Sequence, residues 1–309
     1  MREEEKQMVR TAAVVVTHNR KALLEKCLAH LLKQSAVCDV LLVDNASTDG
    51  TGEWAQAFAA SHERVHYRNT GANLGGAGGF SFGMRWAVEA GYSHVWIMDD
   101  DTLPEQDALA RLLEADELLG GEYGFLSSVV LWTDGRECRM NRQKLKKAYY
   151  ERVELLEHGV ILAEQATFVS CLFRAEVIER AGLPIKEFFI WGDDIEYTRR
   201  LSVRMKLPCY LVGKSRVVHA MKENNGSSIA ADMPRRISRY NYAFRNENYL
   251  YRQEGVRGFV FYTAKCALNL LRILRFARDH RLRRCTVIVK QYTLGLLFHP
   301  KIEYVTRKG

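Results

Sequence analysis

Short apolar runs alternate with segments of helical periodicity over the first hundred residues of the chain. The runs AAVVVT and HVWIM are typical of strands buried on both faces, whereas apolar positions between 23 and 32 recur every three or four residues, as on one face of a helix. The expected elements are strands over 12–17, 40–43, 65–67 and 94–98, and helices over 23–32, from about 51, and over 82–89.

This alternation predicts an α/β fold with right-handed crossovers and a mostly parallel central sheet flanked by helices. Polar residues follow three of the strands directly, at His18-Asn19, Asp44-Asn45 and Asp99–Asp101. Ligands of such sheets bind at the carboxyl ends of the strands. We therefore expect these three groups to converge on one edge of the sheet.

The pattern becomes less regular in the second half of the chain. The further elements expected there are strands over 125–132, 167–174 and 215–218, a variable insertion at 136–162, and a strand or loop from 188 that leads into a helix ending near 200. From Pro234 onward the chain is helical and basic. We accordingly divide it into an α/β domain, 1–230, and a helical C-terminal region, 231–309.

Charge is distributed unevenly between these two parts. The whole chain carries a formal charge of +8, but residues 234–309 hold 17 Lys and Arg against 4 Asp and Glu. The remainder holds 28 basic and 33 acidic residues and is therefore slightly acidic. The tail is expected to meet an anionic surface.

The cysteines and the N-terminus indicate a cytoplasmic setting. The seven cysteines are scattered without a CxxC pair, which favours reduced thiols. The charged start MREEEKQMVR is unlike a signal peptide, and no uninterrupted apolar run approaches the roughly 20 residues of a membrane span.

The triplet Asp99-Asp100-Asp101 follows an apolar strand and is a candidate metal site. Alternate residues of an extended chain point the same way, so Asp99 and Asp101 can share one ion while Asp100 turns aside. Carboxylates suit Mg²⁺ or Mn²⁺ that also carries a diphosphate. His219 ends a strand and is a candidate further ligand. The structural alternatives are a solvated acidic turn and a histidine without a metal.

The glycine-rich segment 73–79 leads into the third helix. Glycines permit close approach of the backbone to a ligand, and a helix N-terminus favours anions. The GxGxxG spacing is absent and the first strand ends in THNR, which disfavours a Rossmann-type oxidoreductase. A tight turn explains the segment equally well.

Two further carboxylates, Asp193 and Asp194, follow Trp191-Gly192, a context that suggests a shaped cleft. Asp194 has no obvious partner and is a candidate general base. Glu196 lies at helical ion-pair spacing from the two arginines that follow it. A helix N-cap is the structural alternative for Asp194.

Five ordered segments carry more information together than any one of them alone. They are VVVTHNR at 14–20, VDNASTDGT at 43–51, the stretch 73–79, WIMDDD at 96–101 and WGDDIEYTRR at 191–200. This set resembles a family 2 glycosyltransferase with the GT-A fold over roughly residues 10–225. Its NxGGAGGF and WGDD motifs resemble the bacterial galactofuranosyltransferases, and rhamnosyltransferases, which would use dTDP-rhamnose, are close relatives.

The resemblance implies an inverting, Mn²⁺- or Mg²⁺-dependent transfer from a UDP-sugar, such as UDP-galactofuranose, to a glycan or lipid-linked glycan acceptor. It implies that Asp99, Asp101 and His219 hold the metal and that Asp194 deprotonates the acceptor hydroxyl, with the adjacent Asp193 as the alternative base. The residues expected around the nucleotide sugar, with Asp44 at the uracil, are Thr17, Asn19, Arg20, Asp44, Asn45, Asn73, Gly76, Asp99, Asp100 and Trp191.

A protein that binds nucleic acid through its basic tail is a competing hypothesis from another class. The tail is rich in side chains that stack on bases and hold phosphates, namely Arg235, Arg236, Tyr240, Tyr242, Arg245, Tyr249, Tyr251 and Arg252. It carries no recognisable nucleic-acid-binding signature and leaves DDD and WGDD unexplained. We therefore expect no nucleic-acid partner.

The C-terminal helices are expected either to bind a membrane surface or to pack within the protein. In 258–277, Lys265, Arg272 and Arg275 fall on one side of a helix, and Phe259, Leu270, Ile273 and Leu274 on the other. Further arginines and an apolar stretch at 287–298 follow. Such helices lie on an anionic membrane surface, here the inner face of the cell membrane, or else pack on the α/β domain or in a homo-oligomer.

Overall fold

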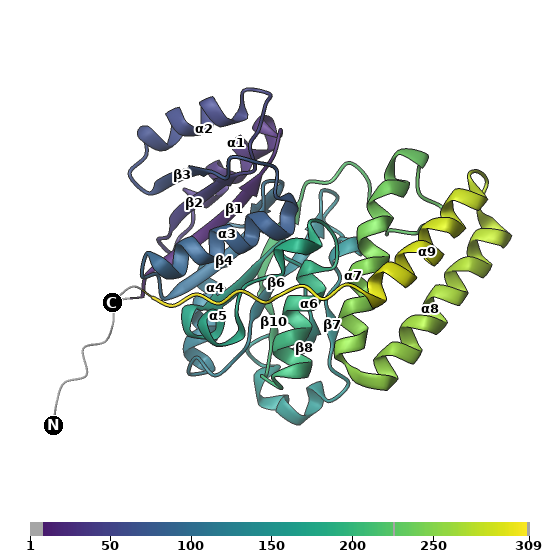
Figure 1. Ribbon diagram of the computed structural model, residues 1–309. Coiled ribbons are helices and arrows are strands. Elements are labelled where there is room, and N and C mark those ends of the chain that lie inside the picture. The colour runs from purple at the N-terminus through teal and green to yellow at the C-terminus, as the bar shows by residue number, and fades with distance from the viewer. Residues whose placement is uncertain (1–8, 225, 308–309) are drawn as a thin grey trace.

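The computed structural model describes residues 9–224 and 226–307, which form an α/β body with a layer of helices at one end (Figure 1). Strands and helices alternate through the first half: β1 Thr11–Thr17, α1 Lys21–Leu31, β2 Asp39–Asp44, α2 Thr51–Ala60, β3 Val65–Asn69, α3 Gly75–Glu89, β4 His94–Asp99, β5 Thr102–Pro104 and α4 Ala108–Leu118. The body continues with β6 Leu126–Trp132, β7 Lys144–Leu145, β8 Val160–Gln165, β9 Cys171–Arg174, α5 Ala175–Ala181, α6 Asp193–Arg199 and β10 Tyr210–His219. The end layer consists of α7 Tyr240–Gln253, α8 Gly255–Phe276 and α9 Arg281–Leu296.

The strands form a ten-stranded sheet in the order β3-β2-β1-β4-β9-β6-β10-β8-β7, with β5 paired to β10. β3, β2, β1 and β4 run parallel, as do β6 and β10, whereas β9 runs antiparallel between β4 and β6. A helix occupies each crossover among the first four strands. The predicted α/β fold with helices flanking a central sheet is confirmed. The longest parallel part of the sheet consists of its first four strands, β1 to β4.

Two expected segments of the second half differ in extent. The strand expected over 167–174 is only β9, because the residues before Cys171 leave the ladder and Thr167 instead accepts a hydrogen bond from Asn141. The insertion expected over 136–162 ends earlier, because Val160 and Ala163 are buried within β8, which pairs with β10.

The central strand β1 separates two apolar cores. Its seven residues are all buried, and successive side chains point to opposite faces. Val14 and Val16 join the core beneath α3, whereas Ala13 and Val15 join the core beneath α1 and α4. This two-sided burial explains the uninterrupted apolar run of the sequence.

Helix α3 begins at Gly75, so the glycine-rich segment forms its first turns and the helix is longer than the expected 82–89. Glycine weakens a helix, which hides this part from a periodicity argument. The reason for glycine here is packing: a Cβ on Gly79 would lie 2.4 Å from Val16, and one on Gly83 would lie 2.3 Å from Val14. The two glycines let α3 lie close against β1.

The end layer is joined to the α/β body by polar contacts from α7. Asn246 donates from Nδ2 to the backbone oxygens of Phe188 and Trp191 at 3.0 and 2.8 Å. After α9 the chain returns along the body (Figure 1), where Glu303 forms ion pairs with Arg85 and Lys186. Part of the C-terminal region therefore packs on the α/β body, which was one of the alternatives to membrane binding in the sequence analysis.

Side chains of the tail that resembled a nucleic-acid surface serve this packing. Tyr240 and Tyr249 are buried, and Arg252 donates to the backbone oxygens of Gly295 and Phe298.

All seven cysteines lie in the described part of the chain and are free thiols. Among the helices that the structure describes, none combines the length and the apolar character needed to cross a bilayer.

Candidate functional site

The carboxyl ends of β1, β2 and β4 meet at one edge of the sheet, as predicted. The register pairs Thr17 with Asp44 and Val16 with Asp99, so the strands end side by side. Across this edge Thr17 donates from Oγ1 to Oδ2 of Asp100 at 2.7 Å.

Arg20 at the start of α1 holds the acidic triplet from one side. Its Nη1 lies 3.2 Å from Oδ1 of Asp100 and 2.8 Å from Oδ2 of Asp101. Asp100 and Asp101 are buried, which contradicts the alternative of a solvated acidic turn. Burial raises the pKa of Asp100 to about 6 although Arg20 opposes that rise.

The loops after β1 and β2 are bonded to each other. Asn19 has a positive φ of 56°, a conformation that asparagine adopts more readily than most residues. It bridges the two loops: its backbone amide donates to Oγ of Ser47, and its Oδ1 accepts from the backbone amide of Thr48 at 2.7 Å. Asp44 is fully buried and accepts hydrogen bonds from Ser47, Tyr67 and Asn69.

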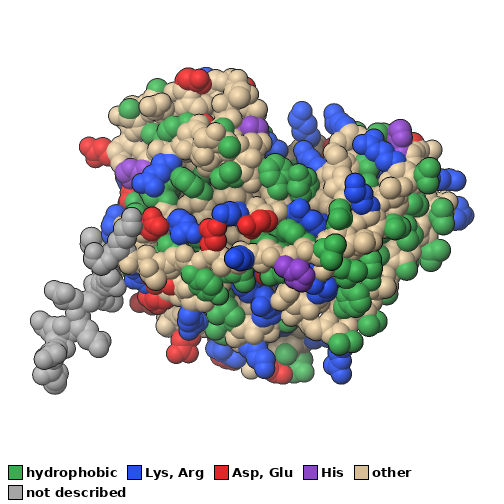
Figure 2. Space-filling view, viewed as in Figure 1, with side chains coloured by type: hydrophobic (Ala, Val, Ile, Leu, Met, Phe, Trp, Pro, Cys, Tyr) green, Lys and Arg blue, Asp and Glu red, His purple; other side chains and the backbone are tan. Residues whose placement is uncertain are grey.

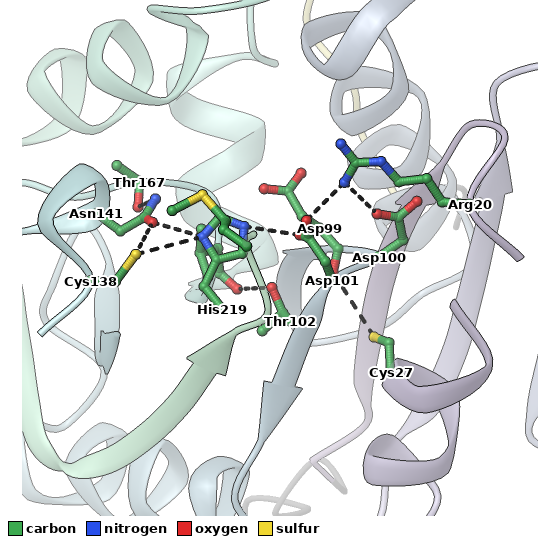
Figure 3. Close-up of polar contacts among 12 residues, drawn as sticks. Arg20, Cys27, Asp99, Asp100, Asp101, Thr102, Cys138, Asn141, Thr167 and His219 are labelled. Atoms are coloured by element: carbon green, nitrogen blue, oxygen red, sulfur yellow. Dashed lines mark hydrogen bonds and ion pairs between the residues drawn. The ribbon is translucent and has the colours of Figure 1, made fainter. Parts of the chain in front are cut away.

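Three candidate ligand side chains come together beside this edge. Single ligand atoms of Asp99, Asp101 and His219 all lie within 4.8 Å of one another. Figure 3 shows His219 and Arg20 on either side of Asp101, with the Asp99 carboxylate next to them. Asp100 turns toward β1 instead, as the alternation of an extended chain predicts.

The charges of the cluster depend on one another. Desolvation and the neighbouring Asp101 carboxylate raise the pKa of Asp99 to about 7. Burial opposes ionisation of Asp101, but the hydrogen bond from His219 holds its pKa below the usual value. Desolvation likewise disfavours the charged imidazole, yet the bond to Asp101 raises the pKa of His219 to about 10. A cation at this point would relieve the repulsion between the two carboxylates.

His219 is oriented by residues that the sequence analysis assigned to a variable insertion. Its Nδ1 lies 2.8 Å from Oδ1 of Asn141, which also accepts from Sγ of Cys138 at 3.0 Å. Asn141 in turn donates to Thr167. These bonds leave Nε2 as the ring nitrogen that faces the carboxylates, as in sites where a second layer of side chains fixes a ligating histidine. Nothing in the local sequence marks Asn141, because only the fold brings it to His219.

Asp193 and Asp194 begin helix α6, and Gly192, with φ of 90°, occupies the N-cap. The N-cap alternative for Asp194 is therefore wrong. Asp193 is buried and Asp194 half-buried. Burial, the Asp194 charge and the charge of Asp99 raise the pKa of Asp193 well above its usual value, whereas desolvation raises the pKa of Asp194 to about 6. The charge of Asp99, one of the metal-ligand candidates, therefore acts on Asp193 at the start of α6.

Glu196 has the structural role that its spacing suggested. It forms a buried ion pair with Arg200 one turn along the helix. Arg199 pairs with Glu254 and Glu164 instead, which ties α6 to the turn after α7.

The loop before α6 is strained and tightly held. Phe189 and Trp191 have positive φ values of 61° and 65°, which are unusual for large side chains. The Phe189 carbonyl accepts from the amide of Ala77 at 3.2 Å, and a Cβ on Gly75 would lie 2.0 Å from its oxygen. Such strain persists where surrounding contacts fix the backbone, often at functional sites. Trp191 is half-buried against Tyr240.

The remaining nucleotide-site candidates lie near the start of α3. Asn45 is buried and donates to the backbone oxygen of Gly75 at 2.9 Å, and Asn73 accepts from the amide of Gly75. A Cβ on Gly76 would meet no atom within 4 Å. Packing in this structure therefore does not require glycine at 76.

One basic side chain of the tail interacts electrostatically with Arg20 at this edge. Arg239, at the end of the short 3₁₀ helix Pro234–Arg239, has its pKa lowered by desolvation and by the charges of Arg236, Arg20 and Arg235. Arg236 also lies over the Trp191 ring. The sequence analysis assigned the charge of the tail only to an external surface, whereas the charge of Arg239 also acts on Arg20.

Comparison with protein families finds a match to the model of "Glycosyl transferase family 2" over residues 12–153. The chain is 30% identical over 262 residues to galactofuranosyltransferase GlfT1 of Mycobacterium tuberculosis, covering 79% of this chain and 83% of that protein. It is 36% identical over 135 residues to the undecaprenyl-phosphate mannosyltransferase of Micrococcus luteus, covering 42% of this chain and 55% of the relative.

Solved structures share the fold. The mannosyltransferase PcManGT from Pyrobaculum calidifontis, in complex with GDP-Man and Mn²⁺, aligns with a TM-score of 0.56 at 19% identity, over 93% of this chain and 80% of that one. GalNAc-T7 with UDP, GalNAc and Mn²⁺ aligns with a TM-score of 0.58 at 13% identity, over 78% of this chain and 50% of that one. At these identities the likeness is one of fold.

Proposed function

This chain belongs to glycosyl transferase family 2 and is a glycosyltransferase, and on that premise we propose that it moves galactofuranose from UDP-galactofuranose to a hydroxyl group of a cell-surface or lipid-linked glycan, with inversion. Its fold is GT-A, as the sequence predicted. The galactofuranosyl specificity is supported by the similarity to GlfT1, which spans most of both chains.

The observation that carries the proposal is the cluster of Asp99, Asp101 and His219 at the edge formed by Thr17 and Arg20. Its donor set fits Mn²⁺ or Mg²⁺, because carboxylate oxygens and an imidazole nitrogen lie close enough to share one ion. Asp99, Asp101 and His219 would hold that ion. Once bound, it would supply Lewis-acid stabilisation of the negative charge on the leaving diphosphate.

The chain's own basic residues would attract the nucleotide to this edge. Arg20 bridges Asp100 and Asp101, which fixes both carboxylates, and the charge of Arg239 from the tail interacts with that of Arg20. Positive charge along a cleft raises the local concentration of an anionic substrate. Asp44 and Asn45, fixed by several hydrogen bonds, would shape the base and ribose pocket.

Asp194 is proposed as the general base. It is half-buried at the start of α6, with a pKa of about 6, so it is mostly ionised at neutral pH. It would accept the proton of the acceptor hydroxyl while that oxygen bonds to the anomeric carbon and the bond to the UDP oxygen breaks. Attack from the face opposite the leaving group inverts the anomeric centre without a covalent enzyme intermediate. Asp193 is the less suitable base, because it is more deeply buried and burial raises its pKa well above the usual value.

A donor panel tests the proposal directly. The purified chain with Mn²⁺ is offered UDP-galactofuranose, UDP-galactopyranose, GDP-mannose and dTDP-rhamnose, with galactan or rhamnosyl fragments as acceptors. We expect transfer from UDP-galactofuranose, with a β-linked product if the donor is the α-anomer. Transfer from dTDP-rhamnose alone would assign the chain to the rhamnosyltransferase alternative.

A further inference from the structure

The outward side of α8 carries an exposed apolar stripe. Its members recur every three or four residues, which places them on one side of the helix. They are Val256, Val260, Ala264, Ala267, Leu271 and Leu274, all of which are exposed. Leu271 is 63% exposed and Val256 80% exposed, so the described part of the chain leaves these apolar side chains largely uncovered. A contiguous apolar surface of this kind marks an interaction site.

This stripe lies on the side of α8 away from the protein core. Of the four apolar residues that the sequence analysis placed on the binding side, only Leu274 belongs to this stripe. The other three face inward: Ile273 is fully buried, and Phe259 and Leu270 are half-buried. Tyr262 is buried with them and stacks on Tyr292 of α9. The helix is therefore apolar on two sides, and the outer one remains open to solvent.

Helix α9 continues the exposed face. It packs beside α8 through the Tyr262–Tyr292 stack and the bond between Thr263 and Tyr292, and its buried residues face α7, as those of α8 do. Its outward residues Leu282, Val289 and Leu296 are exposed at helical spacing. We call the exposed residues of the two helices the α8–α9 face. In Figure 2 hydrophobic side chains and basic ones lie together over this end of the molecule.

Positive charge surrounds the α8–α9 face. Helical spacing places Arg272 along one edge, Arg283 and Lys290 along the other, and Arg257 and Arg275 near the two ends of the α8 stripe. Residues 255–298 contain nine Lys and Arg and a single acidic residue, Asp279, which pairs with the buried Arg284. Within the described ranges, no carboxylate forms an ion pair with these five edge residues.

We propose that the α8–α9 face lies on the surface of an anionic lipid bilayer, with its apolar side chains at the acyl boundary and its basic rim among the phosphates. The charge pattern favours this occupant, because an apolar centre with a basic edge is complementary to anionic headgroups over hydrocarbon. A second copy of the chain would bring two basic rims together, which is unfavourable. With this face on the bilayer, both helices would lie along its surface.

Vesicle co-sedimentation of the full chain tests this proposal independently of catalysis. We expect the protein to pellet with phosphatidylglycerol vesicles at low salt and to remain largely in the supernatant with phosphatidylcholine vesicles. The double variant Leu271→Glu, Leu274→Glu should bind phosphatidylglycerol more than about tenfold more weakly, because two exposed leucines that would enter the bilayer are replaced by charges that the headgroups repel. Val153→Glu is the matched control, since Val153 is 63% exposed like Leu271 but lies on the α/β body.

A second variant separates the contribution of charge. Arg272→Gln with Arg275→Gln keeps the apolar stripe and should lower partition onto phosphatidylglycerol about thirtyfold, with a weaker salt dependence. Unchanged melting temperatures show that these exposed substitutions leave the fold intact. The proposal is overturned if the wild-type chain stays in the supernatant with phosphatidylglycerol at low salt, or if the leucine variant binds like Val153→Glu. A lipid-free dimer that the leucine variant dissociates would overturn it in favour of a second copy.

Discussion

Nε2 of His219 lies 2.9 Å from Oδ1 of Asp101, although the two residues are 118 positions apart in the chain. The contact follows from strand register. β5 comes directly after the acidic triplet and pairs antiparallel with β10, so His219 stands opposite Thr102, the neighbour of Asp101. The short strand β5 thus assembles the metal-ligand candidates, and the first prediction concerns them.

Replacing Asp101 by alanine should reduce transfer by a factor on the order of 10²–10³, because a metal bound at this site would contribute several kcal/mol to stabilising the leaving charge. Mn²⁺-dependent UDP binding, measured by calorimetry, should disappear together with activity. Glu114→Ala, which removes an exposed carboxylate on α4, is the control and should change neither. Full activity of the wild-type chain in excess EDTA would contradict a metal-dependent transfer.

Asn141→Ala should weaken Mn²⁺ binding about 10- to 100-fold, the usual effect of removing the partner of a ligating histidine. Asn141 holds Nδ1 of His219, and without it the ring is free to rotate Nε2 away from Asp101. Asn141→Asp keeps an acceptor at the same position and should retain most of the affinity. Equal Mn²⁺ affinity in the alanine variant and the wild-type chain would show that Asn141 does not position the ring.

Asp194→Asn should lower turnover by a factor on the order of 10²–10⁴ and leave UDP affinity unchanged, because the amide keeps the shape but accepts no proton. Asp193→Asn is the matched comparison one residue away. Rapid-quench measurement of transfer distinguishes loss of chemistry from loss of binding. If Asp193→Asn is inactive while Asp194→Asn turns over normally, the base is Asp193.

Turnover should fall as the pH is lowered through about 6, roughly tenfold for each further unit, since the base acts only when ionised. Turnover falls toward low pH because Asp194 loses its charge there: desolvation raises its pKa to about 6, and below that pH the carboxyl group is increasingly protonated. The profile of kcat/KM for the wild-type chain measures this limb. It should be absent from the residual activity of Asp194→Asn, and a limb that persists there would have another origin.

UDP-galactofuranose should be used in preference to UDP-galactopyranose, with a ratio of kcat/KM on the order of 10² or more, because a pocket that hydrogen-bonds one set of sugar hydroxyls rejects a differently shaped ring. Competition between the two donors in one reaction, followed by mass spectrometry of the product, measures this ratio. Equal use of the two donors would contradict the proposed specificity for galactofuranose but not the assignment as a glycosyltransferase.

The amino-acid sequence determined the α/β architecture and one edge of the site. Strands buried on both faces must be apolar throughout, so β1 and β4 are visible as uninterrupted runs, and parallel strands end at the same edge, which predicted the meeting of Thr17, Asp44 and the acidic triplet. Alternation along an extended chain predicted that Asp99 and Asp101 share a side while Asp100 turns away.

Only the tertiary structure decided which distant residues complete the site and which faces stay exposed. Periodicity shows that α8 has apolar sides but not which of them meets a neighbour, so the sequence assigned Ile273 outward where packing buries it. It gave no sign of Asn141, because its role depends on a contact with His219 across the chain. The sequence analysis also placed the start of α3 too late, because glycine has a low helix propensity. Glycines 79 and 83 are needed because β1 lies close to the helix, and no local preference reveals that contact.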